Sequence, residues 1–127
     1  MDEIDKLNGK DLNDVLYMLK NLGKVGLICI SNTRKYFLSL NPRITSRMQF
    51  KSINFPPYSN QELLTILRQR VEDCRALYPN SYSKEILEKI ADLAAGDARI
   101  AIQTLRNAAY NAEKTNRTRI TDGESAR

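Results

Sequence analysis

The chain has 127 residues, of which 42% are hydrophobic and 28% charged, the size and composition of one ordinary globular domain. Its 20 Lys and Arg against 15 Asp and Glu give a formal charge of +5, which suits a nucleic-acid partner. There is no histidine, and Cys29 and Cys74 lack metal-ligand spacing, which excludes the common zinc sites and histidine acid–base chemistry.

A helical pattern and a strand-like pattern follow each other near the start. Apolar residues recur at helical spacing over about 11–21, and Gly23 suits the end of that helix. The continuous apolar run from Val25 to Ile30 predicts a strand that is buried on both faces in a parallel sheet.

Shorter elements are expected before a pair of prolines. Residues 36–40 and 43–48 are predicted to form two short helices. Residues 52–55 are a brief strand candidate, closed by Pro56 and Pro57, which cannot continue a ladder or a helix interior. The proline pair is therefore the expected boundary between two parts of the chain.

Start and stop signals predict three helices in the second half. Ser59 and Glu62 have the spacing of a capping box. Ser83 is the expected cap of a second helix. Gly96 ends that helix, and Asp97 caps a third.

These patterns predict an α/β architecture that is predominantly helical. Residues 1–56 would form a partial α/β core with the remnant of a parallel sheet. Residues 57–116 would form a three-helix bundle, followed by a polar tail at 117–127. The bundle should be the best-ordered region, because its caps and apolar stripes agree.

Two polar pairs could contribute to nucleotide chemistry. Asp2 and Glu3 suit hydrolysis, since one carboxylate can hold hydrated Mg²⁺ and the next can polarise the attacking water. Ser31 and Asn32 follow the predicted strand, at the edge where α/β sheets place their ligands. A solvated acidic pair and a helix cap explain the same residues, so the alternatives stay open at this point.

Three arginines have the chemistry for phosphate, because a guanidinium stays charged and can bond bidentately. Arg43 and Arg47 are four residues apart and would share a helix face. Arg99 falls in the first turn of a helix, where the macrodipole disfavours a cation but the amides favour an anion. Ordinary exposed arginines would look the same, so this alternative also stays open.

The order of these signals is more specific than any one of them. Along the chain come Asp-Glu, an apolar run ending in Ser-Asn, Pro-Arg-x-x-Ser-Arg, Phe-Pro-Pro-Tyr and Gly-Asp-Ala-Arg. The series resembles the AAA+ module of the origin-recognition and cell-division-control replication initiators, and most closely the archaeal ones. The resemblance runs from Asp2 to about Thr121.

The resemblance implies a nucleotide site in the first part of the chain. Asp2 and Glu3 match the Walker B carboxylates, with Asp2 for the metal and Glu3 for water activation. Asn32 matches sensor 1. ATP and Mg²⁺ are the implied cofactors.

The resemblance also implies roles for the arginines. Arg47 matches the arginine finger, which acts on a nucleotide held by a neighbouring subunit, and Arg43 is the alternative in the same segment. Arg99 matches sensor 2, on a helical lid formed by residues 57–116.

The phosphate-binding Walker A loop has no counterpart, since none of the 5 glycines belongs to a G-x-x-x-x-G-K pattern. The family's inserted initiator motif and winged helix are also not found. We therefore expect a half-length relative or fragment of an initiator that hydrolyses little or no ATP alone and docks on full-length subunits. Double-stranded DNA would be contacted through that assembly. An uncovered strand edge also predicts self-association.

Two other functions fit parts of the sequence. A helical interaction module without a nucleotide role could bind protein or DNA through basic side chains, namely Arg99, Arg106, Lys114, Arg117 and Arg119. A clamp-loader-type ATPase fragment would share the Ser-Arg finger, but the Phe-Pro-Pro-Tyr segment argues against it.

No membrane partner is expected. The longest apolar run is far shorter than the roughly 20 residues that cross a bilayer, and the first residues are acidic, unlike a signal peptide. Unpaired cysteines favour a reducing compartment. We therefore expect a cytoplasmic protein, or a nuclear one in a eukaryote.

Overall fold

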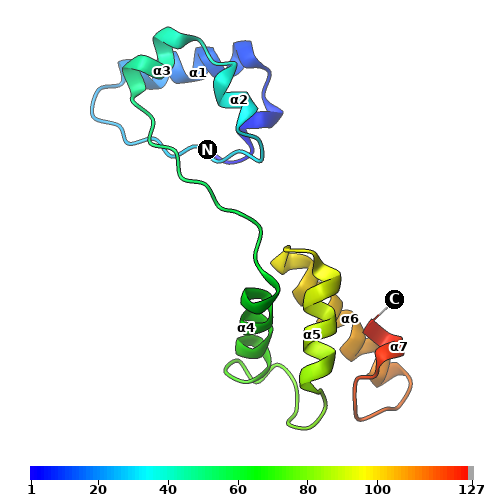
Figure 1. Cartoon of the computed structure of the whole chain (residues 1–127). Helices are drawn as coiled ribbons and strands as arrows, with labels where there is room; N and C mark the ends of the chain where they lie inside the picture. The colour runs from blue at the N-terminus through cyan, green and yellow to red at the C-terminus, as the bar shows by residue number, and fades with distance from the viewer. Residues whose placement is uncertain (126–127) are drawn as a thin grey trace. The chain divides into compact units, whose positions relative to one another are not determined.

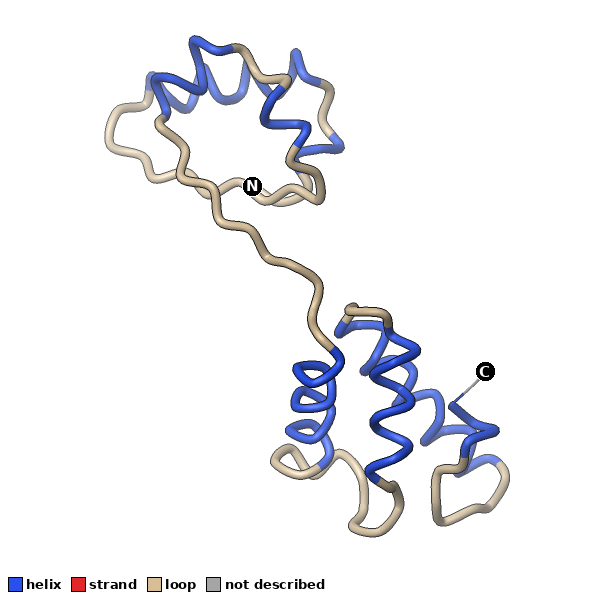
Figure 2. Tube along the Cα trace, in the orientation of Figure 1, coloured by secondary structure: helices blue, strands red, loops and turns tan. Residues whose placement is uncertain are grey.

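A computed structural model describes residues 1–125, and residues 126 and 127 lie outside the described part. The chain divides into two compact units, Met1–Asn54 and Phe55–Arg127 (Figure 1). Within residues 1–125 every regular element is a helix, and no strand is present (Figure 2). No helix among these residues is long and apolar enough to span a bilayer.

The first unit contains one 13-residue helix and three shorter ones, and two of the four begin at a capping side chain. They are the 3-10 helix η1 (Ile4–Lys6), α1 (Gly9–Asn21), α2 (Lys35–Leu38) and α3 (Pro42–Met48). The Asn8 side chain caps α1 by accepting a hydrogen bond from the Asp11 amide, and Asn41 caps α3. The core is small, with five buried apolar residues: Ile4, Leu12, Leu16, Leu40 and Ile44.

The predicted strand at Val25–Ile30 is wrong for the described chain, and so is the remnant of a parallel sheet. The Met1 amine donates to the Ile28 carbonyl at 2.6 Å, and the Met1 carbonyl accepts from the Ile30 amide at 2.8 Å. One residue bonded on both sides has the parallel pattern but does not make a ladder. The segment Val25–Ile30 is extended but largely unpaired.

Burial explains why the segment differs from a buried strand. Leu27 and Cys29 pack against the core, whereas Val25 and Ile28 are exposed. A parallel strand needs cover on both faces and partners on both edges. The described residues cover one face only. The candidate strand at 52–55 is likewise extended and exposed.

The three helices predicted for the second half are confirmed. They are α4 (Asn60–Val71), α5 (Lys84–Ala94) and α6 (Ala98–Lys114), and a short α7 (Asp122–Ser125) follows. Ser59 and Glu62 form both bonds of the capping box, Ser83 caps α5, and Asp97 caps α6. Each cap satisfies amide groups that lack an intrahelical partner, which explains why the helices begin at these residues.

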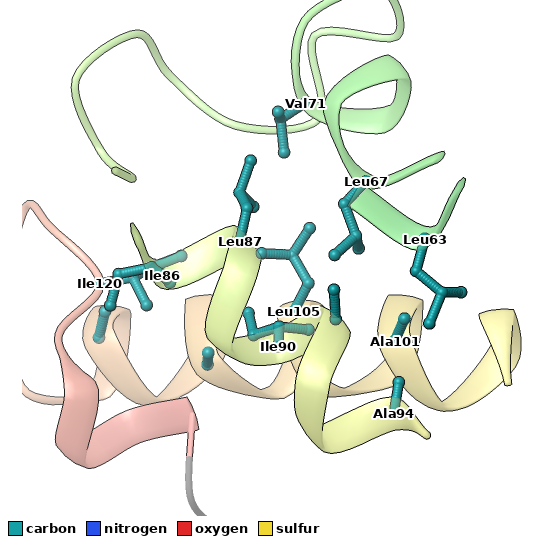
Figure 3. Close-up of a cluster of buried hydrophobic side chains, with 13 residues drawn as sticks. Leu63, Leu67, Val71, Ile86, Leu87, Ile90, Ala94, Ala101, Leu105 and Ile120 are labelled. Atoms are coloured by element: carbon teal, nitrogen blue, oxygen red, sulfur yellow. The ribbon is translucent and has the colours of Figure 1, made fainter. Parts of the chain in front are cut away.

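A single apolar cluster holds these helices together (Figure 3). Leu63 and Leu67 of α4, Ile90 of α5 and Ala101 of α6 are fully buried. Ile120 is only 7% exposed and belongs to the same cluster. The prediction of a polar tail at 117–127 is therefore wrong at Ile120, which holds the segment before α7 against the core.

Candidate functional site

Two of the predicted polar pairs lie close together in the first unit. The Ile30 amide donates to the Met1 carbonyl at 2.8 Å, and the Ile4 amide donates to the Ile30 carbonyl at 3.1 Å. Asp2 and Glu3 are the two residues between these bonds, and Asn32 follows Ile30 by two residues. The backbone therefore places the segment that carries Asp2 and Glu3 beside Ile30, and the side chains of Asp2, Glu3 and Asn32 are exposed.

Glu3 has an unusual backbone conformation at this place. Its φ of 51° is left-handed, which is uncommon for a residue other than glycine and costs free energy unless its surroundings enforce it. The Asp2 carboxylate accepts a hydrogen bond from the Glu3 amide at 2.8 Å. The Glu3 carboxylate forms an exposed ion pair with Lys6 at 2.7 Å. The carboxylates of Asp2 and Glu3 therefore extend from a turn that is already bonded to Ile30.

The donor set suits a hydrated metal ion rather than a closed metal cage. No group of three or more metal-binding His, Cys, Asp or Glu side chains is present in residues 1–125. Mg²⁺ commonly uses one or two carboxylates and keeps several waters or phosphate oxygens. Asp2 with Glu3 could hold the ion in that way, and the Asn32 amide could contact a phosphate or water.

Asp5 was not singled out from the sequence. One of its carboxylate oxygens, Oδ1, is buried and has no hydrogen-bond partner in the described residues. Buried acceptors are nearly always paired, so a carboxylate of this kind stands out from a solvated one. The only feature of the sequence that could have pointed to Asp5 is its position two residues after Glu3.

The two candidate finger arginines lie on α3. Arg43 is in the first turn and Arg47 in the last, and both are exposed without an ion-pair partner in the described part of the chain. The helix macrodipole favours a cation in the last turn, so Arg47 has the more favourable position. The structure does not bring either arginine into contact with Asp2, Glu3 or Asn32.

Arg99 lies in the second unit, in the first turn of α6. Its amide donates to the Asp97 carboxylate at 2.8 Å, and its side chain is exposed. The cap at Asp97 fixes the start of α6 and hence the position from which Arg99 extends.

Two sequence motifs of the second unit meet at this start. The Tyr58 amide, in Phe-Pro-Pro-Tyr, donates to the carbonyl of Gly96, in Gly-Asp-Ala-Arg, at 3.0 Å. Gly96 has a φ of +90°, and a Cβ there would lie 2.8 Å from the Cβ of Pro57. Glycine is therefore required on two grounds, conformation and space. The contact ties the segment before α4 to the residue that precedes the cap of α6.

In the part of the chain that the structure describes, the pKa is shifted at Glu62, Glu85 and Cys29. The backbone amide and the hydroxyl of Ser59 lower the pKa of Glu62. Glu85 has its pKa lowered by its own backbone amide and by the Ser83 hydroxyl. Burial raises the pKa of the Cys29 thiol, which fits a side chain that packs inward and makes it a weaker nucleophile.

Comparisons with known proteins agree on one group of relatives. A family model for the Cdc6 AAA+ ATPase-type lid domain matches residues 64–125. An ORC1-type DNA replication protein of Pyrococcus abyssi is 38% identical over 131 residues, covering 96% of this chain and 31% of the relative. ORC1-type DNA replication protein 1 of Sulfolobus acidocaldarius is 38% identical over 130 residues, covering 95% and 32%. The chain thus spans about a third of the length of these relatives.

Solved structures give the same result. The ORC1 protein of Aeropyrum pernix, in complex with DNA, matches with a TM-score of 0.82 and 31% identity over 98% of this chain and 34% of that one. Cdc6p of Pyrobaculum aerophilum matches with a TM-score of 0.80 and 28% identity, covering 94% of this chain and 35% of that one.

Proposed function

Because the chain belongs to the family of archaeal ORC1-type and Cdc6 replication initiators, we propose that it supplies part of the nucleotide site of an AAA+ ATPase. The observation that carries the proposal is the backbone pairing of Met1 and Ile4 with Ile30. That pairing holds the turn of Asp2 and Glu3 beside Ile30, two residues before Asn32.

Each of these side chains has a proposed task. Asp2 would hold Mg²⁺, which would supply positive charge against the phosphates of ATP. Glu3 orients and polarises the attacking water. Asn32 senses the γ-phosphate or positions that water. The left-handed turn at Glu3 supports this assignment, because conformations of that cost cluster at functional sites.

The arginines act at two further places in the proposal. Arg47 reaches the nucleotide of a neighbouring full-length initiator subunit, where a guanidinium stabilises the charge of the transition state. Arg43 is the alternative finger on the same helix. Arg99 contacts the phosphates from the lid. Contact with DNA comes through the assembly, as the DNA complex of the Aeropyrum relative suggests.

The proposal includes weak nucleotide binding by these 127 residues alone, since none of them forms a Walker A loop. Amides and a lysine around the β- and γ-phosphates normally supply much of the affinity for ATP. Titration calorimetry of the purified chain with ATP and Mg²⁺ should show no tight binding. Magnesium-dependent affinity near 1 μM, about −8 kcal/mol, would contradict this part of the proposal.

The role in trans needs a second test. The chain is mixed with a full-length ORC1-type protein that has an intact Walker A loop, and ATP hydrolysis is measured. Arg47→Ala should reduce any stimulation at least about tenfold, since arginine fingers contribute large factors. Lys51→Ala, at an exposed basic residue just beyond α3, is the matched control. If neither Arg47→Ala nor Arg43→Ala has an effect, the finger role is wrong.

A further inference from the structure

The second unit contains a groove of about 1160 Å³ that runs along α6 from Ile102 to Glu113. One wall is the loop after α4, which includes Tyr78 and Ser81. The floor is the face of α6 that carries Ile102, Arg106 and Ala109, and the other wall is the segment 117–120. Three stretches that lie far apart in the sequence therefore build a single concave surface.

Positive charge is concentrated in this groove. Its lining includes four arginines and one acid, namely Arg70, Arg106, Arg117, Arg119 and Glu113. The whole of residues 55–127 is close to neutral, with 11 Lys and Arg against 10 Asp and Glu. Arg70, Arg106 and Arg119 have no carboxylate partner in the part of the chain that the structure describes. Their charge is thus available to an anion.

Aromatic side chains lie among these arginines. Tyr78 is 85% exposed and Tyr110 is 50% exposed, and both line the groove. The Arg106 guanidinium lies over the Tyr110 ring, 5.5 Å from its centre. Ile102 and Ala109 add apolar floor between them. Flat aromatic faces beside cations are the features on which nucleic-acid bases stack.

Backbone bonds fix the shape of the groove. The Arg117 amide donates to the Ala112 carbonyl at 2.9 Å, and the Asn116 amide donates to the Glu113 carbonyl at 3.0 Å. With Asn116 left-handed at φ 54°, these two bonds form a Schellman motif that ends α6. The Ile120 amide then donates to the Ser81 carbonyl at 2.9 Å, which ties the two walls together. A ligand would therefore meet a largely preformed site.

We propose that this groove binds single-stranded nucleic acid, with the arginines on the phosphates and Tyr78 and Tyr110 against the bases. The inference goes beyond the nucleotide role proposed above and depends on none of its residues. A duplex fits less well, because its phosphates lie on a convex surface and its bases are stacked inside. An acidic peptide would use the arginines but would have no need of two flat exposed rings.

The test uses the whole chain and a labelled oligothymidylate of about 12 nucleotides, within the range of single-strand site sizes. Fluorescence anisotropy is measured at several salt concentrations between about 50 and 200 mM, with a duplex of equal length and an oligouridylate in parallel. Single strands, DNA or RNA, should bind more tightly than the duplex. Tyr78→Ala should weaken binding at least about fivefold, while Tyr78→Phe, which keeps the ring, should remain within about twofold of the original.

Arginine variants test the phosphate contacts. Arg70→Gln and Arg119→Gln should each reduce the slope of log affinity against log salt by about 0.7. Arg68→Gln, at an exposed arginine of α4 that does not line the groove, should leave the slope unchanged. Circular dichroism shows whether each variant is folded. Tyr110→Ala is a second test of the contact between an aromatic ring and the bases.

Several outcomes would overturn the proposal. Absence of binding at the lowest salt would do so. Equal or tighter binding of the duplex, or equal losses with Arg68→Gln, would show attraction by general charge only. If polyglutamate competes with the oligonucleotide and Tyr78→Ala does not weaken binding, the groove is a site for acidic peptides instead.

Discussion

The two units reach their folded state by different means. Residues 55–125 pack three capped helices around a cluster of 13 buried residues, whereas residues 1–54 bury five apolar residues around one 13-residue helix and three shorter ones. The first unit also leaves large apolar side chains in solvent, among them Val25, Ile28 and Ile30. Hydrophobic burial is the main favourable contribution to folding, so the two units should respond differently to substitution.

The two units differ because helices and strands need partners at different distances along the chain. A helix satisfies its own backbone and needs cover on one stripe, which neighbouring helices of the same unit supply. A strand needs partners beside it and cover on both faces, and in a parallel sheet these come from distant parts of a chain. The segment Val25–Ile30 has the composition of such a strand, but its backbone pairs with a distant part of the described chain only at Met1 and Ile4.

The largest expected effect is in the core of the second unit. Ile90 is fully buried in α5, and Ile90→Ala removes methyl groups from a closed cluster. The free energy of unfolding should fall by about 2–5 kcal/mol. Urea unfolding followed by circular dichroism measures this. Leu93→Ala in the same helix, at a side chain 53% exposed, is the control and should change stability little.

A decrease in the free energy of unfolding below about 1 kcal/mol for Ile90→Ala would contradict the contrast between the two units. The second unit would then tolerate cavities as a loosely packed core does.

The next effect concerns the contact between the two motifs of the second unit. Gly96→Ala forces a side chain into a φ of +90° and into a space 2.8 Å from the Pro57 Cβ and 3.2 Å from the Tyr58 carbonyl oxygen. We expect a loss of about 1–3 kcal/mol from conformational strain and displaced backbone. Thermal unfolding gives the value. Gly123→Ala, where nothing lies within 4 Å, is the matched control and should not destabilise.

The second unit was also the more predictable from sequence. The caps at Ser59, Ser83 and Asp97 were predicted and are confirmed, because each depends on residues within one turn. Ile120 was missed, because one apolar residue in a polar stretch has no period to reveal it. Its burial depends on the bond between its amide and the Ser81 carbonyl, 39 positions away.

The candidate sites show the same limit. Asp2, Glu3 and Asn32 were proposed from their order in a motif series, and their catalytic roles stay predictions. The groove was anticipated in part, since Arg106, Arg117 and Arg119 had been noted as basic positions. The wall formed by the loop after α4 could not be found from a single helix pattern, because Arg70 and Tyr78 come from α4 and that loop.

A smaller effect tests the capping box of α4. Ser59→Ala removes the hydroxyl that accepts from the Glu62 amide at 3.2 Å, and stability should fall by about 1 kcal/mol at neutral pH. The Ser59 amide, with its hydroxyl, lowers the pKa of Glu62 in the folded chain. That contribution is complete above the ordinary pKa of a carboxyl group and is lost as the pH falls through the lowered value.

The difference between the original chain and Ser59→Ala should therefore shrink between neutral pH and about pH 3, as Glu62 becomes protonated. Ser52→Ala, at an exposed serine that caps no helix, should show no such dependence. A constant difference at all pH values would show that the Ser59 hydroxyl does not contribute to the lowered pKa of Glu62, since Ser59→Ala keeps the backbone amide.

The smallest effect on stability, and the sharpest contrast between the units, is expected at Ile28. Its side chain is 78% exposed on the uncovered face of the extended segment, so Ile28→Lys should change the free energy of unfolding by no more than about 0.5 kcal/mol.

Ile28→Lys should nevertheless weaken self-association, because a charge on an apolar edge opposes pairing with a second chain. Sedimentation velocity at high concentration should show the original chain self-associating and the variant shifted toward monomer. Leu93→Lys, on an exposed face of the second unit, should leave the distribution unchanged. If the original chain is monomeric, the prediction that this face pairs with a second chain is wrong. A large loss of stability in Ile28→Lys would mean that the face is covered within the chain itself.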